Sequence, residues 1–187
     1  FFNYFRLPSG QIALLVGDVS GKGVGAALLM ANIQASLRTR LALGQDLASI
    51  AREIDSDVDA NTPGSVYATL FLAMLDVEAH ELRYVNAGHN PQYVLRGGGG
   101  LDHMASTGMP VGLLSGHGYV EHRLEVAPGD VLFFYTDGCV ECENEAGEEF
   151  GAERLEALLG GHAASGVDEV LASVEKSIAT FRGTREP

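Results

Sequence analysis

The chain has 187 residues, of which 46% are hydrophobic and 20% charged, and this composition fits one folded domain with a single core. Its 25 acidic residues outnumber the 12 basic ones and give a formal charge of −13, which repels phosphate backbones and argues against nucleic-acid binding. Its apolar runs are too short to span a membrane and no signal-like leader opens it, so we expect a cytoplasmic domain without membrane insertion.

The first part of the chain is predicted to form one strand followed by two helices. Residues 12–16 are a short apolar run that predicts a buried strand. Good helix formers predict a helix over residues 24–40, and Asp46 is the expected N-cap of a second helix over residues 46–61. This second helix carries one apolar stripe, made by Leu47, Ile50, Ile54 and Val58.

The rest of the chain is predicted to form strands and then a second pair of helices. Residues rich in Val, Tyr, Phe and Leu predict strands over 66–76, 82–85, 92–95, 119–126 and 131–135. The turn sequences Gly88-His89-Asn90-Pro91 and Pro128-Gly129-Asp130 predict two hairpins among them. The closing helices are expected over residues 153–159 and around Val170, Leu171, Val174, Ile178 and Phe181. Separate blocks of helices and antiparallel strands predict an α+β fold.

Two acidic residues beside apolar strands are the candidates for chemistry. Asp18 lies in Gly17-Asp18-Val19-Ser20-Gly21-Lys22-Gly23, and Asp137 lies in Tyr135-Thr136-Asp137-Gly138. A carboxylate at a strand end is held rigidly, and two of them brought together would form an oxygen-rich site for Mg²⁺ or Mn²⁺. The spacing leaves a second interpretation open, in which each aspartate only caps its own turn.

Three other features point less clearly to chemistry. Lys22 follows a glycine as in a phosphate-binding loop, but it precedes glycine instead of Ser or Thr, and the first glycine of that motif is missing. His89, beside glycine and proline, is either a hydrogen-bonding turn residue or a catalytic one. Cys139 and Cys142 form a C-x-x-C pair without a second pair, so we interpret both as small buried side chains.

Four motifs follow one another along nearly the whole chain. They are Gly17-Asp18-Val19-Ser20-Gly21-Lys22-Gly23, Tyr84-Val85-Asn86-Ala87-Gly88-His89-Asn90-Pro91, Gly108-Met109-Pro110-Val111-Gly112, and Tyr135-Thr136-Asp137-Gly138 with Glu141. In this order and spacing they resemble the SpoIIE-like group of the PPM metal-dependent serine/threonine protein phosphatases. The resemblance implies a single phosphatase domain over residues 1–187, built from two packed antiparallel sheets flanked by helix pairs.

The same resemblance implies a reaction and its metals. The family hydrolyses phosphoserine or phosphothreonine on a protein, usually an anti-anti-sigma-type regulator in bacterial signalling, and a sensor domain on the same parent chain is a further expected partner. By resemblance Asp18 bridges two Mn²⁺ or Mg²⁺ ions, the carbonyl of Val19 binds one of them and Asp137 the other. The positions expected to support the loop or the substrate are Ser20, Gly21, Lys22, Gly23, His89, Asn90 and Gly138.

The chain departs from the family pattern near both of its ends. The family has a metal-binding Gly-Gly-Asp before the aromatic pair that is Phe1-Phe2 here, and a following acid is Asn3 here. The family also continues into a strand that starts Asp-Asp, where this chain ends on Arg185-Glu186-Pro187. We therefore expect a domain without the first and last family strands. Two alternatives stay open, a catalytically inactive PPM-fold module that binds its partner and a hydrolase of small phosphoesters.

Overall fold

The computed structural model describes residues 1–62, 66–114 and 116–184. It divides into two compact units, which we call the first unit (Phe1–Pro91 with Ala105–Val126) and the second unit (Gln92–Met104 with Ala127–Pro187). Each unit combines one antiparallel sheet with one pair of helices, so the predicted α+β class with two sheets and two helix pairs is confirmed. Residues 185–187, where the family pattern would continue into another strand, lie outside the described residues.

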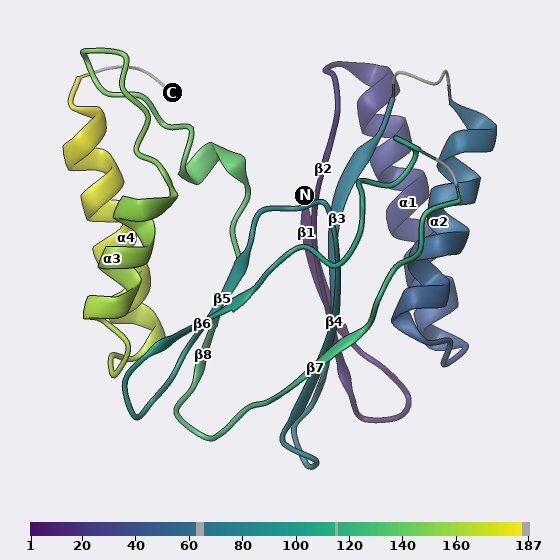
Figure 1. Ribbon diagram of the computed structural model, residues 1–187, viewed down its shortest axis with the longest axis horizontal. Coiled ribbons are helices and arrows are strands. Elements are labelled where there is room, and N and C mark those ends of the chain that lie inside the picture. Colours follow the sequence, from purple (N-terminus) through teal and green to yellow (C-terminus); the bar gives the residue numbers. More distant parts are fainter. Residues whose placement is uncertain (63–65, 115, 185–187) are drawn as a thin grey trace. The chain divides into compact units, whose positions relative to one another are not determined.

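The first unit contains a five-stranded antiparallel sheet in the order β1-β2-β3-β4-β7 (Figure 1). Its strands are β1 (Phe2–Arg6), β2 (Ile12–Val19), β3 (Ala68–Asp76), β4 (Glu81–Ala87) and β7 (His122–Glu125). Strand β2 pairs with β1 on one side and with β3 on the other, where Ile12 lies opposite Leu75 and Val19 opposite Ala68. Strand β1 was not predicted.

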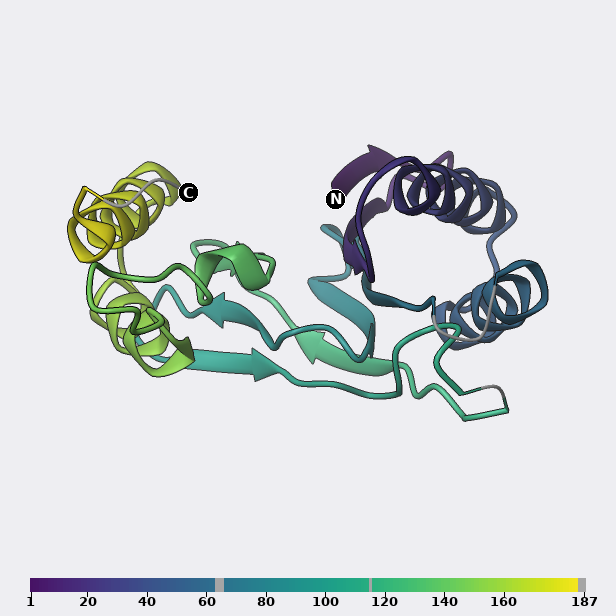
Figure 2. The ribbon, with the colours of Figure 1, turned by 90° about the horizontal axis from the view of Figure 1, so that it is seen from above.

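Two helices, α1 (Val24–Ala42) and α2 (Leu47–Asn61), pack together and contact β2 and β4 of this sheet. Figure 2 shows them side by side. The predicted cap is confirmed, because the Asp46 carboxylate accepts the Ser49 N–H at 2.8 Å. The predicted stripe of α2 is buried at all four positions. Helix α1 buries Ile33, Leu37 and Leu41, whereas its first turns leave Val24 and Leu28 exposed.

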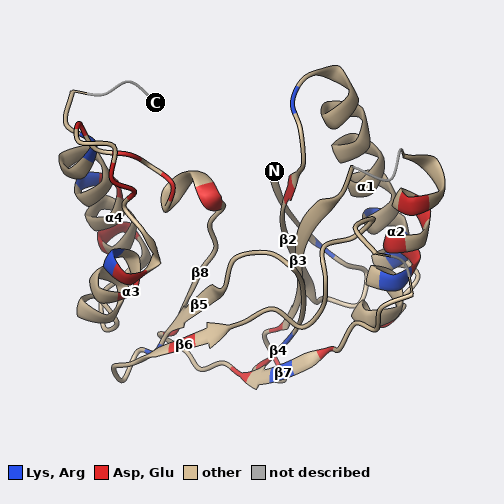
Figure 3. Cartoon of the chain, turned by 45° about the horizontal axis from the view of Figure 1, so that its top comes forward, with Lys and Arg blue, Asp and Glu red and all other residues tan. Residues whose placement is uncertain are grey.

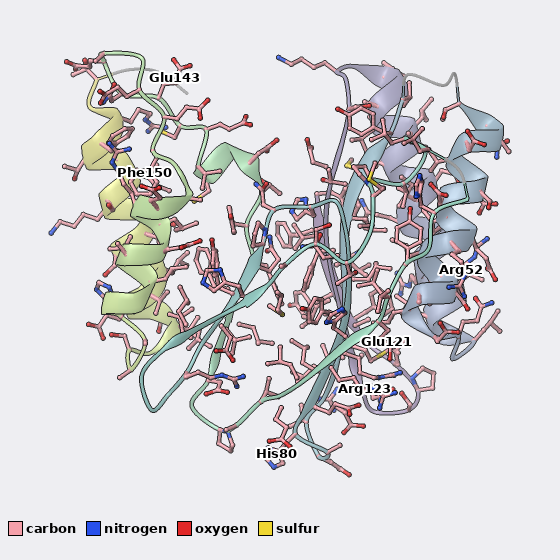
Figure 4. All side chains as sticks on the ribbon, in the orientation of Figure 1. Arg52, His80, Glu121, Arg123, Glu143 and Phe150 are labelled. Atoms are coloured by element: carbon pink, nitrogen blue, oxygen red, sulfur yellow. The ribbon has the colours of Figure 1, made fainter. Side chains whose placement is uncertain are left out.

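The second unit contains a three-stranded antiparallel sheet in the order β6-β5-β8 and the helices α3 and α4. Its elements are β5 (Gln92–Leu95), β6 (Leu101–Met104), β8 (Val131–Phe133), α3 (Ala152–Gly161) and α4 (Val167–Arg182). Phe150, labelled in Figure 4, meets the ring of Phe181 edge to face with 5.3 Å between centroids. Of the positions expected to be apolar in the last helix, Val170 and Val174 are buried, and Leu171 is exposed.

Both predicted hairpins are wrong. The turn after β4 is present, but β4 pairs with β3 and β7, whereas β5 pairs with β6 and β8. Likewise, the strands on either side of Pro128-Gly129-Asp130 belong to different sheets. Turn residues reverse the chain locally, but the partner of a strand depends on which surface it can cover. Strand β6 was not predicted.

Acidic side chains occur on many elements. Figure 3 shows Asp and Glu on α2, α3 and β7, with Lys or Arg near them. Glu121, the residue before β7, and Arg123 of β7 lie close to each other (Figure 4), with 3.6 Å between their charged groups. Among the described residues, Asp55 is the one buried carboxylate. In the same part of the chain, no helix is at once long and apolar enough to cross a membrane.

Candidate active site

Asp18 lies inside β2, not beyond its end as predicted, because the strand continues to Val19. Its partner across the ladder is Thr69 of β3. The side chain of Asp18 is exposed, whereas Val19 is buried in the core of the first unit. The preceding Gly17 allows this close pairing, since a Cβ there would lie 2.7 Å from the carbonyl oxygen of Thr69. The sheet therefore fixes the backbone of Asp18 and presents its carboxylate to solvent.

The loop that follows β2 is hydrogen-bonded to Tyr67, the residue before β3, and leads into α1. The Ser20 N–H donates to the carbonyl of Tyr67, and the Ser20 hydroxyl accepts the Tyr67 N–H, both at 2.9 Å. Lys22 is exposed. Gly21 has a φ of 93°, and Gly23, the N-cap of α1, has φ 86° and ψ −161°, a combination that is nearly restricted to glycine. The glycines thus let the chain turn from β2 into α1 within four residues.

His89 is buried and connects two elements beside Asp18. Its Nδ1 lies 2.7 Å from the hydroxyl of Thr69, the residue opposite Asp18, and its backbone N–H donates to the Asn86 side chain at 2.8 Å. Directly opposite residues in an antiparallel pair place their Cβ atoms about 4.5–5.5 Å apart on one face. His89 therefore makes the hydrogen bonds expected of a turn residue, and it contacts Thr69, the cross-strand neighbour of Asp18.

Asn86 organises this turn, a role that the sequence analysis did not assign to it. It is fully buried, and its amide accepts the His89 N–H and donates to the carbonyl of Asn90 at 3.2 Å. Its backbone carbonyl accepts the Thr107 N–H at 2.8 Å, and its backbone N–H donates to the Thr107 hydroxyl at 2.9 Å. Asparagine is depleted in strands, so an asparagine near the end of a predicted strand is the signal that would have revealed it.

Asp137 follows β8 at a distance, which differs from the prediction of an acid directly after a strand. Strand β8 ends at Phe133, and Asp137 starts a 3₁₀ turn that runs to Cys139. The carboxylate accepts the Gly138 N–H at 2.8 Å, and the Asp137 carbonyl accepts the N–H groups of Val140 and Glu141. Asp137 thus forms a hydrogen bond within its own turn, and a carboxylate with one such bond keeps lone pairs that suit a cation.

The buried carboxylate of Asp55 connects α2 to the Gly108–Gly112 motif. It accepts the backbone N–H of Gly112 at 2.8 Å. Tyr119 lies beside it, and burial together with the Asp55 charge raises the pKa of the Tyr119 hydroxyl. This contact explains how a motif without acidic or basic residues takes part in the fold of the first unit.

The two cysteines pack against the core of the second unit. Burial, followed by the charge of Cys142, raises the pKa of Cys139 to about 11, so its thiol stays protonated at neutral pH. Both side chains are partly buried, so the interpretation of them as small buried side chains holds only in part.

The groups that could hold metal ions are the carboxylates of Asp18 and Asp137 and the carbonyl of Val19. All three donors are oxygens, the ligands that Mg²⁺ and Mn²⁺ prefer, so the residues fit these cations in kind. Asp18 and Val19 belong to the first unit, and Asp137 belongs to the second. In the described part of the chain, no three side chains of His, Cys, Asp or Glu gather as a metal site.

Comparison with known proteins finds one family over almost the whole chain. The model of the family described as Stage II sporulation protein E (SpoIIE) matches residues 8–186. Protein IcfG of Synechocystis sp. is 28% identical over 182 residues, which cover 83% of this chain and 29% of IcfG. Phosphoserine phosphatase RsbU of Bacillus subtilis is 25% identical over 180 residues, covering 95% of this chain and 53% of RsbU.

A solved structure supports the same relationship. The RsbU and RsbW domains of Rv1364c from Mycobacterium tuberculosis align with a TM-score of 0.83 and 26% identity, over 98% of this chain and 51% of that one. The chain therefore spans about half or less of the length of these relatives.

Proposed function

The chain belongs to the SpoIIE family, and on this premise we propose that it is a metal-dependent phosphatase that hydrolyses phosphoserine or phosphothreonine on a protein. The family match over residues 8–186 carries the proposal, because it includes both acids and all four motifs. We propose further that residues 1–187 form one phosphatase domain, which the continuous family match over residues 8–186 supports.

Two Mn²⁺ or Mg²⁺ ions would be held by Asp18, the carbonyl of Val19 and Asp137. The chemistry that such ions would supply is a lower pKa for a bound water and stabilisation of the negative charge on the phosphoryl group. The chain's own part is positioning: β2 presents the exposed Asp18, and the Ser20 bonds to Tyr67 hold the loop behind it. Water supplies the attacking oxygen, so the products are inorganic phosphate and the free hydroxyl of serine or threonine.

The proposed substrate is a phosphorylated anti-anti-sigma-type protein, acted on in the cytoplasm as part of a bacterial signalling switch. The relative RsbU is named a phosphoserine phosphatase, which supports phosphoserine as the group that is cleaved. A sensor domain on the same parent chain is the proposed source of regulation. Lys22, exposed in the loop after Asp18, is the cation we assign to the incoming phosphoprotein, while Gly21 and Gly23 shape that loop.

Release of inorganic phosphate from a phosphorylated anti-anti-sigma-type protein tests this function. We expect turnover that depends on Mn²⁺ and that Asp18→Asn or Asp137→Asn abolishes without lowering the melting temperature. Asp59→Asn is a matched control, because it removes the same charge from an exposed position on α2. Turnover by Asp18→Asn at the wild-type rate under limiting Mn²⁺ would contradict the metal assignment.

The same assay separates the two alternatives. Faster hydrolysis of a nucleotide than of the phosphoprotein would identify a hydrolase of small phosphoesters. Tight binding of the phosphoprotein with no phosphate release at any Mn²⁺ concentration would identify an inactive binding module.

A further inference from the structure

Gln92, the first residue of β5, is a fully buried amide whose two polar atoms hold one residue. Its Oε1 accepts the N–H of Tyr135 at 2.8 Å, and its Nε2 donates to the carbonyl of Tyr135 at 3.1 Å. A side-chain amide that bonds both backbone groups of one residue reproduces what a neighbouring strand would offer. An amide side chain in a fully buried position needs such partners, because an unpaired donor or acceptor loses its hydrogen bonds to water without replacement.

This contact begins where the strand ladder ends. Strand β5 pairs with β8 at three positions, from Leu95 opposite Val131 to Tyr93 opposite Phe133. The residue before Gln92 is Pro91, which has no N–H to donate to a further ladder bond. The Gln92 side chain therefore supplies both a donor and an acceptor to Tyr135, two residues beyond the last ladder pair.

Tyr135 is further fixed by its ring. It stacks on Tyr93 of β5 with 5.8 Å between centroids and 12° between planes. The Tyr93 hydroxyl in turn donates to Glu156 of α3 at 3.0 Å. Two consecutive residues of β5 thus hold the backbone and the ring of Tyr135, and Asp137 follows only two residues later.

We propose that Gln92 is the positioning residue of Asp137. Its side-chain amide extends the pairing of β5 and β8 to Tyr135 and so fixes the backbone two residues before Asp137. The inference rests on the proposed function for the role of Asp137 as a metal ligand. It goes beyond that function by assigning the placement of this acid to a residue outside the four family motifs.

The test compares Gln92→Met with the wild type in the full chain. Methionine has a similar length but neither a strong donor nor an acceptor, so both bonds to Tyr135 are lost. We expect the affinity for Mn²⁺, measured by calorimetry with Mn²⁺ alone, to fall about tenfold, as for other residues that orient a metal ligand. Without metal, we expect the exchange rates of the Tyr135 and Gly138 amides, measured by NMR, to rise about tenfold or more.

Gln11→Met is the matched control. Gln11 also donates from its amide to a partner, the Asp76 carboxylate at 3.1 Å, but it precedes β2 at the end away from Asp18. This variant should leave the Mn²⁺ affinity and the two amide rates unchanged. Unchanged Mn²⁺ affinity in Gln92→Met, with affinity lost in Asp137→Asn, would overturn the positioning role.

The two proposals fail in different ways. Wild-type Mn²⁺ binding by Asp137→Asn would remove the metal assignment of the proposed function, and the amide rates in Gln92→Met would still decide whether Gln92 holds this segment. If Gln92→Met does not fold, the wild-type chain provides the answer. Its Tyr135 amide should exchange as slowly as the slowest amides of β8, and exchange at the rate of an exposed amide would overturn the inference.

Discussion

The Asp18 and Asp137 regions carry the two proposed acidic metal ligands by different structural means. Asp18 lies inside an eight-residue strand, and Asp18 and the following Val19 both pair with residues of β3. Asp137 lies four residues after a three-residue strand, and the side chains of Gln92 and Tyr93 contact Tyr135 in the segment before it. Continuous main-chain pairing supports the first acid, whereas individual side-chain contacts support the second.

The difference shows which changes each region tolerates. Around Asp18 the backbones are so close that the glycine before it has no room for a side chain, because the carbonyl of Thr69 occupies the space. Around Asp137 the glycine after it has nothing within 4 Å of an added Cβ. Substitutions near Asp18 should therefore change the stability of the first unit, while those near Asp137 should act mainly on the local turn.

The largest expected effect is the loss of activity when either acid is replaced by asparagine, and we expect this loss to differ between Asp18 and Asp137. By the proposed roles Asp18 contacts both ions and Asp137 contacts one, so Asp18→Asn should reduce kcat/KM on the phosphoprotein more than Asp137→Asn does. We expect each loss to be on the order of a hundredfold or more, since each removes charge from a cation site. Kinetics over a range of Mn²⁺ concentrations measure both. An equal loss of kcat/KM in the two variants, or a larger loss in Asp137→Asn, would show that Asp18 does not contact both ions.

Gly17→Ala should have the largest effect on stability. The new methyl would lie 2.7 Å from a backbone oxygen that cannot move without disturbing the β2–β3 ladder. Overpacking of this kind costs about 3 kcal/mol, which urea unfolding would measure. An unfolding free energy within about 0.5 kcal/mol of the wild type, the range usual for surface substitutions, would mean that β2 and β3 are less tightly paired at this position.

Thr69→Val should have an intermediate effect. Valine keeps the shape of threonine but loses the hydroxyl that bonds His89 Nδ1, and the buried ring then lacks this partner. We expect a loss of about 1–2 kcal/mol in unfolding free energy and a several-fold rise in the Mn²⁺ concentration for half-maximal activity. Thr69→Ser, which keeps the hydroxyl, should restore the Mn²⁺ dependence. A normal Mn²⁺ titration for Thr69→Val would limit His89 to a structural role in its turn.

Gly138→Ala should have the smallest effect. Its φ is not in the left-handed region and an added methyl meets no atom, so we expect a change within about 0.5 kcal/mol in unfolding free energy. Its N–H, which donates to the Asp137 carboxylate, is kept. A large loss of stability would show that the Asp137 turn is packed as tightly as the Asp18 strand. A loss of activity alone would indicate that substrate or metal approaches this glycine closely.

The sequence by itself determined the features that depend on short-range chemistry. The Asp46 cap and the α2 stripe were predicted because capping and helical periodicity involve residues three or four apart. The order of the four motifs was enough to indicate the family, because a motif is a local pattern. The α+β class followed from the blocks of apolar periodicity, which do not depend on the choice of strand partners.

Only the tertiary structure decided which strands share a sheet and which polar side chains support the two acids. Thr69 contacts His89 across 20 residues, and Gln92 contacts Tyr135 across 43, so neither pair has a signature in any local window. Both depend on strand register, since a shift of one residue turns each side chain to the opposite face of its sheet. The acids could be named from the sequence, but the residues that hold them are set by strand pairing.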